Sequence, residues 1–524
     1  MAQLIIHNAA VITQNIYQPI AFAIAVNEGK IIAVGSNEEI LALQQSHTKI
    51  IDAIGKILLP GFNDTHIHVW KVGNLKTFLL DVRSAKSKDE MLETLSSSNK
   101  KNKNNSWLTA RGFNEALWTD ATVPTKNDLD KVSTTRPIMV TRTCAHICVC
   151  NSKALELCNI TKDTTVPAGG MMYWGEDGKP NGIFAETALG LITQHIPAYK
   201  KEELKIMVNA AQEEMLQYGI TAATDPAVEP LLLEAYKEMN EAGELKFRLN
   251  ALPIILPDGD EKPFPIPQKF SSAFLNVNTV KFFSDGGLSG KTAALKRSYK
   301  NSTSKGLLRL EYKQYKELCT QSMENGLAIA THAIGDAAID FVISVYEELH
   351  NSFPKISNRI EHLGLPEKNH LQRMAASNIA ASMQTIFLYE LGRNFINSLD
   401  EEYLNRCYPV ASAIDAGIKV ALSSDAPVVK NFNPIAGIAA AVTRKNMDGN
   451  IIAAHETISI AEALKAYTST AAEISFANNY GSLKAGMKAD FILLNKNPLA
   501  LQPNEINSLQ VEKTFVDGKC VWER

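Results

Sequence analysis

The chain has 524 residues, of which 45% are hydrophobic and 21% charged, and its formal net charge is −3. These values are typical of a globular protein of two or more domains, and they argue against nucleic acid or an anionic membrane as the main partner. Seven cysteines in so long a chain are not the pattern of a disulfide framework. We see neither a signal peptide nor a membrane-length apolar run, so we expect a cytoplasmic protein.

Short apolar strands separated by turns are predicted at both ends of the chain. Residues 1–58 contain the turn signal Asn27-Glu28-Gly29, and "ADFILLN" near the other end precedes a hairpin signal at Val516-Asp517-Gly518. We therefore predict one small β-sandwich domain that is assembled from residues 1–58 and 477–524.

Between these ends, in residues 59–476, eight short β-rich segments alternate with longer helical patterns. The clearest helical patterns cover residues 201–218, 230–242, 314–325 and 336–350. Such alternation predicts an α/β fold with a closed TIM-like (β/α)₈ barrel. The interval after the first segment is too long for a barrel connection, so we predict an insertion at about 71–218 that covers the active-site mouth.

Residues able to bind a metal ion lie at or near the carboxyl ends of five of these segments. They are His66, His68, Lys281, His332, His362 and Asp425. In a strand, residues two apart share a face, so "HIH" would present two imidazoles to one ion. Each residue alone also has an ordinary structural explanation, such as a core histidine or a turn cap. Their shared position, at the end of the strands where barrel active sites form, predicts a metal site.

Several motifs run in order over nearly the whole chain, among them "LPGFNDTHIH", "GKPNGIFAETA", "TVKFFSDGGLSGKTA", "RIEHLG", "LSSDAPV" and "AVTRK". They resemble the motifs of the amidohydrolase superfamily, and within it the amidohydrolase-3 or YtcJ-like group, which includes N-substituted formamide deformylase. The resemblance implies two metal ions. One would be bound by His66, His68 and Asp425, the other by His332 and His362, and Lys281, carbamylated by CO₂, would bridge both.

The resemblance also implies the chemistry. Imidazole and carboxylate ligands suit Zn²⁺, with Fe, Mn, Co or Ni as alternatives. Metal ions lower the pKa of water, so a hydroxide would attack a carbonyl while Asp425 serves as general base and then acid. The implied function is metal-dependent hydrolysis of a non-peptide C–N bond, in an N-substituted amide or formamide.

Two alternative functions remain open at this point. The same site could hydrolyse an ester or lactone, or the chain could be a catalytically weak regulatory or binding relative. Gly335 stands three positions after His332, where deaminases of the superfamily have a glutamate, which disfavours nucleobase deamination. We expect a small-molecule substrate as partner, without nucleic acid or membrane, and leave a homodimer open.

Candidate substrate contacts fall within the insertion. His146 lies in "CAHICVC", where the family usually has Asp-Gly-His, and the alternating cysteines of this motif are typical of small buried apolar residues. Trp118 and Trp174 are candidates to contact an apolar substituent of the substrate from a lid, although aromatic residues of an insertion more often form its own core.

Overall fold

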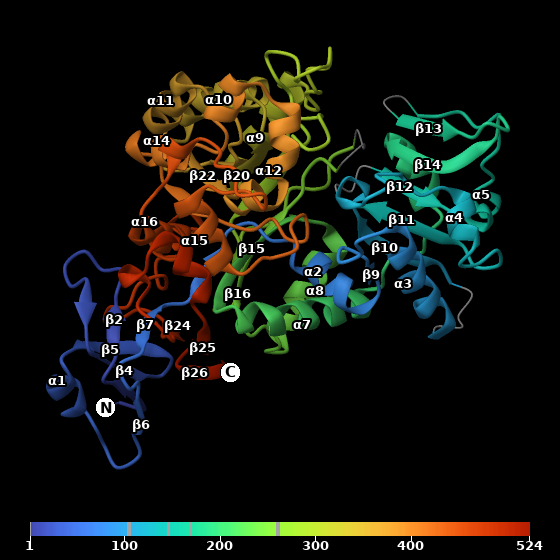
Figure 1. The fold of residues 1–524 in the computed structure, drawn as a ribbon. Helices are drawn as coiled ribbons and strands as arrows, with labels where there is room; N and C mark the ends of the chain where they lie inside the picture. The colour runs from blue at the N-terminus through green and yellow to red at the C-terminus, as the bar shows by residue number, and fades with distance from the viewer. Residues whose placement is uncertain (1, 102–105, 144–146, 168–169, 258–261) are drawn as a thin grey trace. The chain divides into compact units, whose positions relative to one another are not determined.

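The computed structural model describes residues 2–101, 106–143, 147–167, 170–257 and 262–524 (Figure 1). The chain divides into two compact units, and we describe each by itself. Unit 1 comprises Met1–Val69 and Gln212–Arg524, and unit 2 comprises Trp70–Ala211. Unit 2 therefore occupies nearly the interval in which the sequence predicts the insertion.

Two sheets of unit 1 contain strands from the ends of the chain. A four-stranded sheet has the order β5-β4-β1-β6, and a six-stranded sheet has the order β26-β25-β24-β7-β2-β3. Their bounds are β1 (Leu4–His7), β2 (Ala10–Ile12), β3 (Ile20–Ala21), β4 (Ala23–Asn27), β5 (Lys30–Gly35), β6 (Lys49–Asp52), β7 (Ile57–Pro60), β24 (Phe491–Leu494), β25 (Val511–Val516) and β26 (Lys519–Glu523).

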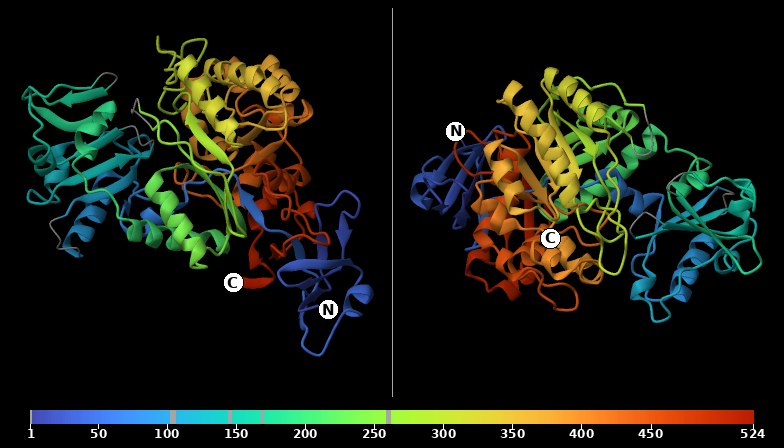
Figure 2. Two further views of the ribbon diagram at one scale, coloured as in Figure 1. Left: turned by 180° about the vertical axis from the view of Figure 1, so that it is seen from behind. Right: turned by 90° about the horizontal axis from the view of Figure 1, so that it is seen from above.

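The two ends of the chain share one hydrophobic core. Strand β7 pairs with β24, placing Leu58 opposite Leu493, and Figure 2 shows these blue and red segments side by side. Buried side chains from both ends, such as Ile6, Leu58, Phe491 and Phe515, belong to one cluster. Neither end completes this core alone.

Two five-stranded sheets form the rest of the strand framework of unit 1, in the orders β17-β18-β16-β15-β8 and β19-β20-β21-β22-β23. Apart from β17, neighbouring strands run parallel. The bounds are β8 (Phe62–Asp64), β15 (Ile220–Val228), β16 (Arg248–Pro253), β17 (Phe270–Ser271), β18 (Leu275–Val277), β19 (Thr279–Phe283), β20 (Ala328–Ala333), β21 (Arg359–His362), β22 (Ala380–Met383) and β23 (Val420–Leu422). Strands β16, β21, β22 and β23 are buried throughout, as expected where both faces of a parallel sheet are covered.

Helices follow most of these strands, and the four patterns read from the sequence are confirmed to within two residues at each end as α7, α8, α9 and α10. The helices of unit 1 and the segment leading into it are α1 (Asn37–Leu41), α7 (Lys201–Gln217), α8 (Pro230–Glu241), α9 (Tyr312–Glu324), α10 (Asp336–Ser352), α11 (Lys368–Ala376), α12 (Ile386–Ser398), α13 (Glu401–Asn405), α14 (Val410–Asp415), α15 (Pro434–Thr443), α16 (Ile460–Ala466) and α17 (Ser469–Ile474), with short 3₁₀ turns η3 (Ala454–Glu456), η4 (Pro498–Ala500) and η5 (Pro503–Ser508). Helix α8 begins at Pro230, a residue favoured in the first helical position.

Unit 2 has its own six-stranded sheet, in the order β13-β14-β12-β11-β10-β9. Its elements are α2 (Val69–Thr77), which begins in unit 1, β9 (Leu80–Asp81), α3 (Lys88–Lys101), β10 (Leu108–Phe113), η1 (Glu115–Leu117), α4 (Lys126–Asp130), β11 (Ile138–Arg142), β12 (Ile147–Cys150), α5 (Ser152–Leu157), β13 (Gly170–Trp174), β14 (Pro180–Glu186), η2 (Thr187–Leu189) and α6 (Gly190–Thr193). Two clusters of buried side chains give this unit a core of its own. None of the helices in the described ranges combines the length and hydropathy that crossing a bilayer requires.

Candidate metal centre

Three buried side chains from distant parts of the sequence meet in unit 1. His66, His362 and Asp425 each bring one potential ligand atom within 4.8 Å of the other two. His362 is the last residue of β21, and Asp425 follows β23. Both have left-handed backbones, with φ of 75° and 57°. Such conformations are uncommon outside glycine and cluster at functional sites.

The two histidines of "HIH" do not lie in a strand, which corrects the expectation from the sequence. Strand β8 ends at Asp64, whose side-chain Oδ1 accepts a hydrogen bond from the backbone N–H of His66 at 3.2 Å. Such a local side-chain bond competes with the strand ladder. The segment is then held from its neighbours, since the N–H of Asp425 donates to the His66 carbonyl (2.7 Å) and that of His68 to the Ala426 carbonyl (2.9 Å).

The Asp425 carboxylate faces both histidines. Nε2 of His66 and Nε2 of His68 each lie 3.3 Å from Asp425 Oδ1, yet that oxygen makes no hydrogen bond within the described part of the chain. Burial alone would raise the pKa of the Asp425 carboxyl, but the charge of His66 holds it well below its usual range. Burial lowers the pKa of His66, and Asp425 and Glu361 raise it to a net value above the usual one. This excess of negative charge among imidazoles suits a bound divalent cation.

Lys281 lies on β19 and is completely buried. Its Nζ makes no hydrogen bond with any described residue and lies 4.6 Å from the centre of the Phe283 ring. Burial lowers the pKa of Lys281 to about 8, although Glu361 and Asp425 oppose the shift. A buried polar atom without a partner calls for an explanation, and an amine of this pKa is far more often neutral than an ordinary lysine.

His332 completes the set from β20, where it pairs in register with Phe283. Its ring centre lies 4.4 Å from that of His362. Burial, followed by the charge of Lys281, lowers the pKa of His332 to about 3, and burial with the neighbouring His332 and His66 lowers the pKa of His362 well below its usual value. Both rings are therefore neutral at pH 7, the state in which imidazole binds a metal ion.

Glu361 and Gln384 are among the residues that contact these histidines, and neither was found from the sequence. Glu361 Oε2 lies 2.5 Å from His66 Nδ1, and Gln384 Oε1 lies 2.7 Å from His362 Nδ1. In the motif "RIEHLG", Glu361 directly precedes His362. The contact between Glu361 and His66, however, depends on the register of the strands. The one signal that could have identified Glu361 is that a charged residue stands in a four-residue strand that is buried throughout.

The predicted substrate contacts have different outcomes. His146 lies outside the described residues. Trp118 is only 4% exposed and belongs to the core of unit 2, where its Nε1–H donates to the Ala85 carbonyl at 3.0 Å. This packing gives Trp118 a structural role, and its contact with a substrate stays a prediction. Trp174 is 48% exposed on β13 and remains available to a ligand.

The described cysteines of "CAHICVC" are buried, as the sequence predicts. Cys148 and Cys150 pack into one hydrophobic cluster of unit 2. Burial raises the pKa of the Cys150 thiol well above its usual value, which describes an inert apolar side chain.

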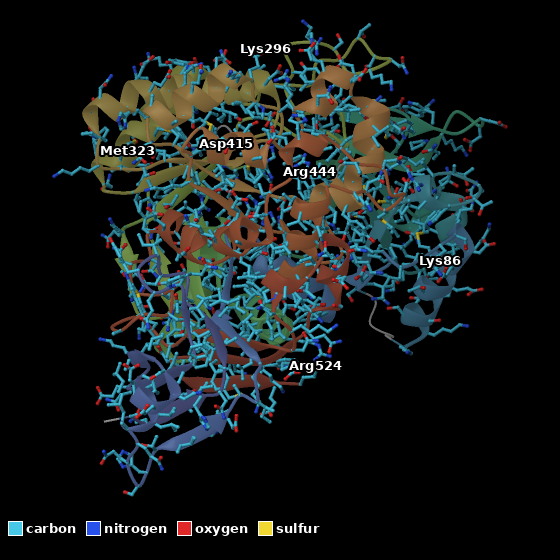
Figure 3. All side chains as sticks on the ribbon, turned by 60° about the vertical axis from the view of Figure 1, so that its left-hand side comes forward. Lys86, Lys296, Met323, Asp415, Arg444 and Arg524 are labelled. Atoms are coloured by element: carbon cyan, nitrogen blue, oxygen red, sulfur yellow. The ribbon has the colours of Figure 1, made fainter. Side chains whose placement is uncertain are left out.

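A buried arginine supports the site from behind. Arg444, labelled in Figure 3, is fully buried, and its guanidinium donates to the carbonyls of Cys407 (2.6 Å), Tyr408 (3.0 Å) and Ile452 (2.8 Å). The Tyr408 ring contacts Phe387 edge-on, and Phe387 stacks on the His362 ring with centres 6.1 Å apart. Arg444 therefore stabilises the loop at Tyr408, which contacts the candidate ligand His362 through Phe387.

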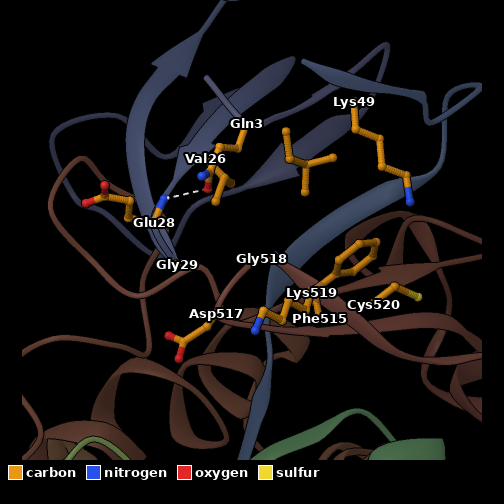
Figure 4. A pocket seen from close by; sticks show the side chains of 11 residues that line it. Gln3, Val26, Glu28, Gly29, Lys49, Phe515, Asp517, Gly518, Lys519 and Cys520 are labelled. Carbon is orange, nitrogen blue, oxygen red and sulfur yellow. Dashed lines mark hydrogen bonds between the residues drawn. The ribbon is translucent and has the colours of Figure 1, made fainter. Parts of the chain in front are cut away.

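A cleft of about 510 Å³ lies elsewhere, between strands near the two chain ends (Figure 4). Lys49, Phe515, Asp517 and Lys519 are among its lining residues, and the described lining contains none of the candidate metal ligands. The volume of this cleft therefore does not identify it as the functional site. The buried titratable groups, which lie elsewhere, are the better indication of that site.

Comparison with known proteins identifies the family to which this chain belongs. Residues 49–522 match the model of the Amidohydrolase family, and the chain belongs to that family. Together with the buried ligand set, membership defines a metal-dependent hydrolase.

Individual relatives cover the chain almost completely. It is 28% identical over 513 residues to YtcJ of Bacillus subtilis (strain 168), covering 96% of each chain. It is 27% identical to the N-substituted formamide deformylase of Arthrobacter pascens, covering 100% of this chain and 99% of that one. The crystal structure of an uncharacterized metal-dependent hydrolase from Pyrococcus horikoshii OT3 superposes with a TM-score of 0.79 at 25% identity, covering 96% of this chain and 99% of that one.

Proposed function

We propose that this chain is a binuclear hydrolase of non-peptide C–N bonds that acts on an N-substituted amide or formamide. One observation carries the proposal: the Lys281 amine and Asp425 Oδ1, both buried and both without a hydrogen bond in the described structure, lie among imidazoles. The full-length similarity to N-substituted formamide deformylase supports the amide class.

The donor set fits two divalent ions, with zinc as the first choice. His66, His68 and Asp425 would hold one ion, and His332 and His362 the other. Lys281 would be shared: its neutral amine attacks the carbon of CO₂ and loses a proton, and the product is an anionic N-carboxylate. Bound divalent ions lower the pKa of water and polarise a carbonyl oxygen.

The residues of the chain then handle the protons. The depressed pKa keeps Asp425 ionised at neutral pH, so its carboxylate can accept a proton from the attacking water. The same group returns that proton to the leaving nitrogen, which departs as an amine. The lowered pKa values of His332 and His362 make both imidazoles weaker proton acceptors than an ordinary histidine.

We also propose that the two five-stranded sheets close into the (β/α)₈ barrel of residues 59–476 and that the terminal sheets pack as the sandwich of residues 1–58 and 477–524. Ile254 bridges to Lys281 between the two five-stranded sheets. On the other side, the N–H of Ser424 donates to Asp64 Oδ1 at 3.2 Å, connecting the ends of β23 and β8. These links support closure.

The test is a substrate panel assayed with metal-loaded protein. N-alkyl and N-aryl formamides and acetamides are compared with esters and lactones of the same substituents, and released amine or acid is quantified. We expect amine release from at least one amide series. Turnover of esters or lactones alone would favour the alternative hydrolase and reject the amide proposal.

Asp425→Asn is the matched inactive variant for this panel. Asparagine tolerates the left-handed backbone of this position and keeps the size of the side chain, but it loses the charge and the proton acceptor. We expect kcat to fall by at least ~10²–10⁴-fold at every pH, with an unchanged circular dichroism spectrum. A near-normal kcat would contradict the role given to Asp425.

A further inference from the structure

Glu361 connects a candidate metal ligand to a buried arginine. Arg359 and Glu361 are two residues apart on β21 and so share a face of the strand. Oε1 of Glu361 accepts from Arg359 Nε at 2.5 Å, while Oε2 faces His66 Nδ1 at 2.5 Å. Arg359, Glu361 and His66 are all more than nine-tenths buried.

The arrangement holds both the side chain and the backbone of the "HIH" segment. Arg359 Nη2 donates to the Thr65 carbonyl, one residue before His66, at 3.2 Å. An ion pair with Arg359 alone would use only one carboxylate oxygen of Glu361 and would not require the other to contact a histidine. Here both oxygens of Glu361 are used, one for Arg359 and one for His66.

The contact determines which nitrogen of His66 is available. A neutral imidazole carries one N–H, and a carboxylate at Nδ1 places the proton there. With an ion bound, Nε2, which faces Asp425 Oδ1 at 3.3 Å, would then be the nitrogen that offers its lone pair. His362 instead has a neutral amide oxygen, that of Gln384, at its Nδ1. A carboxylate partner raises the basicity of a metal-binding imidazole.

We propose that Glu361 is a positioning residue: through Nδ1 it sets the tautomer and orientation of His66, and it makes the ion position beside His66 the tighter of the two. Arg359 donates to the other carboxylate oxygen and so fixes the orientation of Glu361. The inference rests on the metal centre of the proposed function, and it assigns a role to a residue outside the predicted ligand set.

Cobalt is a suitable probe, because bound Co²⁺ reports its ligand geometry in the visible spectrum. Chelator-stripped protein is titrated with Co²⁺ against a competing chelator, in the wild type, Glu361→Leu and Glu361→Gln. For Glu361→Leu we expect a Kd of the first ion about 10–100-fold weaker, together with an altered absorption spectrum. Glu361→Gln should recover part of the affinity, since an amide oxygen still accepts from Nδ1–H.

Ser382→Ala is the matched control. Ser382 is buried and pairs in register with Glu361, and its hydroxyl bonds to Thr65 Oγ1 (2.7 Å) and Ser423 Oγ (3.0 Å) rather than to a histidine. We expect its Kd and cobalt spectrum to match those of the wild type. A wild-type Kd and spectrum in Glu361→Leu would overturn the proposal.

Glu361→Leu leaves Arg359 buried without its carboxylate partner. The double variant Arg359→Met/Glu361→Leu, which removes both charges, is therefore measured in parallel and should show the same loss of Co²⁺ affinity.

Wild-type protein that binds Co²⁺ but hydrolyses no amide would overturn the proposed function and leave this inference standing. Amide hydrolysis with equal Co²⁺ affinity in wild type and Glu361 variants would overturn this inference alone. Failure of the wild type to bind Co²⁺ would overturn both.

Discussion

Lys281 combines features that an ordinary strand lysine lacks. It is completely buried, its Nζ has no hydrogen-bond partner among the described residues, and burial lowers its pKa to about 8. A neutral amine is the form that reacts with CO₂, so this environment favours carbamylation at moderately alkaline pH.

The proposed carbamylation of Lys281 should depend on pH, because only the neutral amine reacts with CO₂ and the pKa of this group is about 8. With a pKa near 8, roughly one-tenth of the amine is neutral at pH 7 and about nine-tenths at pH 9. At a fixed concentration of dissolved ¹³CO₂, we expect the ¹³C NMR carbamate signal of metal-stripped protein to rise steeply from pH 7 to 9 and level off above.

Lys281→Ala provides the control for this experiment. It should give no such signal, lose metal ions and activity together, and regain part of both with added acetate, which can replace the missing anionic ligand. A carbamate signal that persists in Lys281→Ala would assign the modification to another amine.

At the residue scale, the sequence predicted candidate ligands that the structure brings together, but not the side chains that contact them. His66, His362 and Asp425 converge because parallel strands end at one edge, which follows from the alternation of segments. Glu361 and Gln384 could not be predicted, since their partners depend on which buried side chains of different strands face each other. Local periodicity in the sequence does not specify the register between non-adjacent strands.

At the scale of elements, helices were predicted more closely than strands. Periodicity and end signals place α7–α10 to within two residues. Strand β8 has only three residues, because Asp64 bonds to the backbone of His66 and ends it early. This bond joins residues only two apart and replaces a ladder bond, whereas the alternation in "GFNDTHIHV" by itself is typical of a longer strand.

The two tryptophans of unit 2 should behave in opposite ways when replaced. Trp118→Phe removes the hydrogen bond to Ala85 and part of a buried ring, so we expect a loss of about 1–3 kcal/mol in stability, measured by thermal denaturation, and little change in KM.

Trp174→Ala alters an exposed side chain and should leave the Tm unchanged. If Trp174 contacts the substrate, as the sequence predicts, its removal should raise the KM for N-aryl substrates and change the KM for N-alkyl ones less. An unchanged KM across both series would exclude Trp174 as a substrate contact.

At the scale of the whole molecule, the candidate ligands come from both five-stranded sheets of unit 1. His66 and His68 follow β8 of one sheet, while Lys281, His332 and His362 lie on β19, β20 and β21 of the other, and Asp425 follows β23. A metal ion bound to ligands of both sheets stabilises only the folded arrangement that brings them together.

Metal removal should therefore lower both activity and stability. Protein purified without chelator should contain close to two divalent ions per chain by elemental analysis. Stripping them should abolish turnover and lower the Tm, since an ion at 100 times its Kd contributes about 2.7 kcal/mol. Readdition of Zn²⁺ or Mn²⁺ should restore both. Protein with no metal, whose activity neither ion restores, would reject the metal centre.

The shared core of the chain ends has a consequence for synthesis on the ribosome. Apolar strands such as β1 and β7 are translated early, but their partners Phe491 and Phe515 are added last. At about 5–20 residues per second, the intervening chain takes roughly 20–90 s to make. During that interval β7 lacks its partner strand β24, and isoleucine and leucine side chains of the shared core, such as Ile6 and Leu58, are uncovered. Nascent-chain chaperones would therefore engage the segment from β1 to β7 for longer than strands that are translated together with their partners.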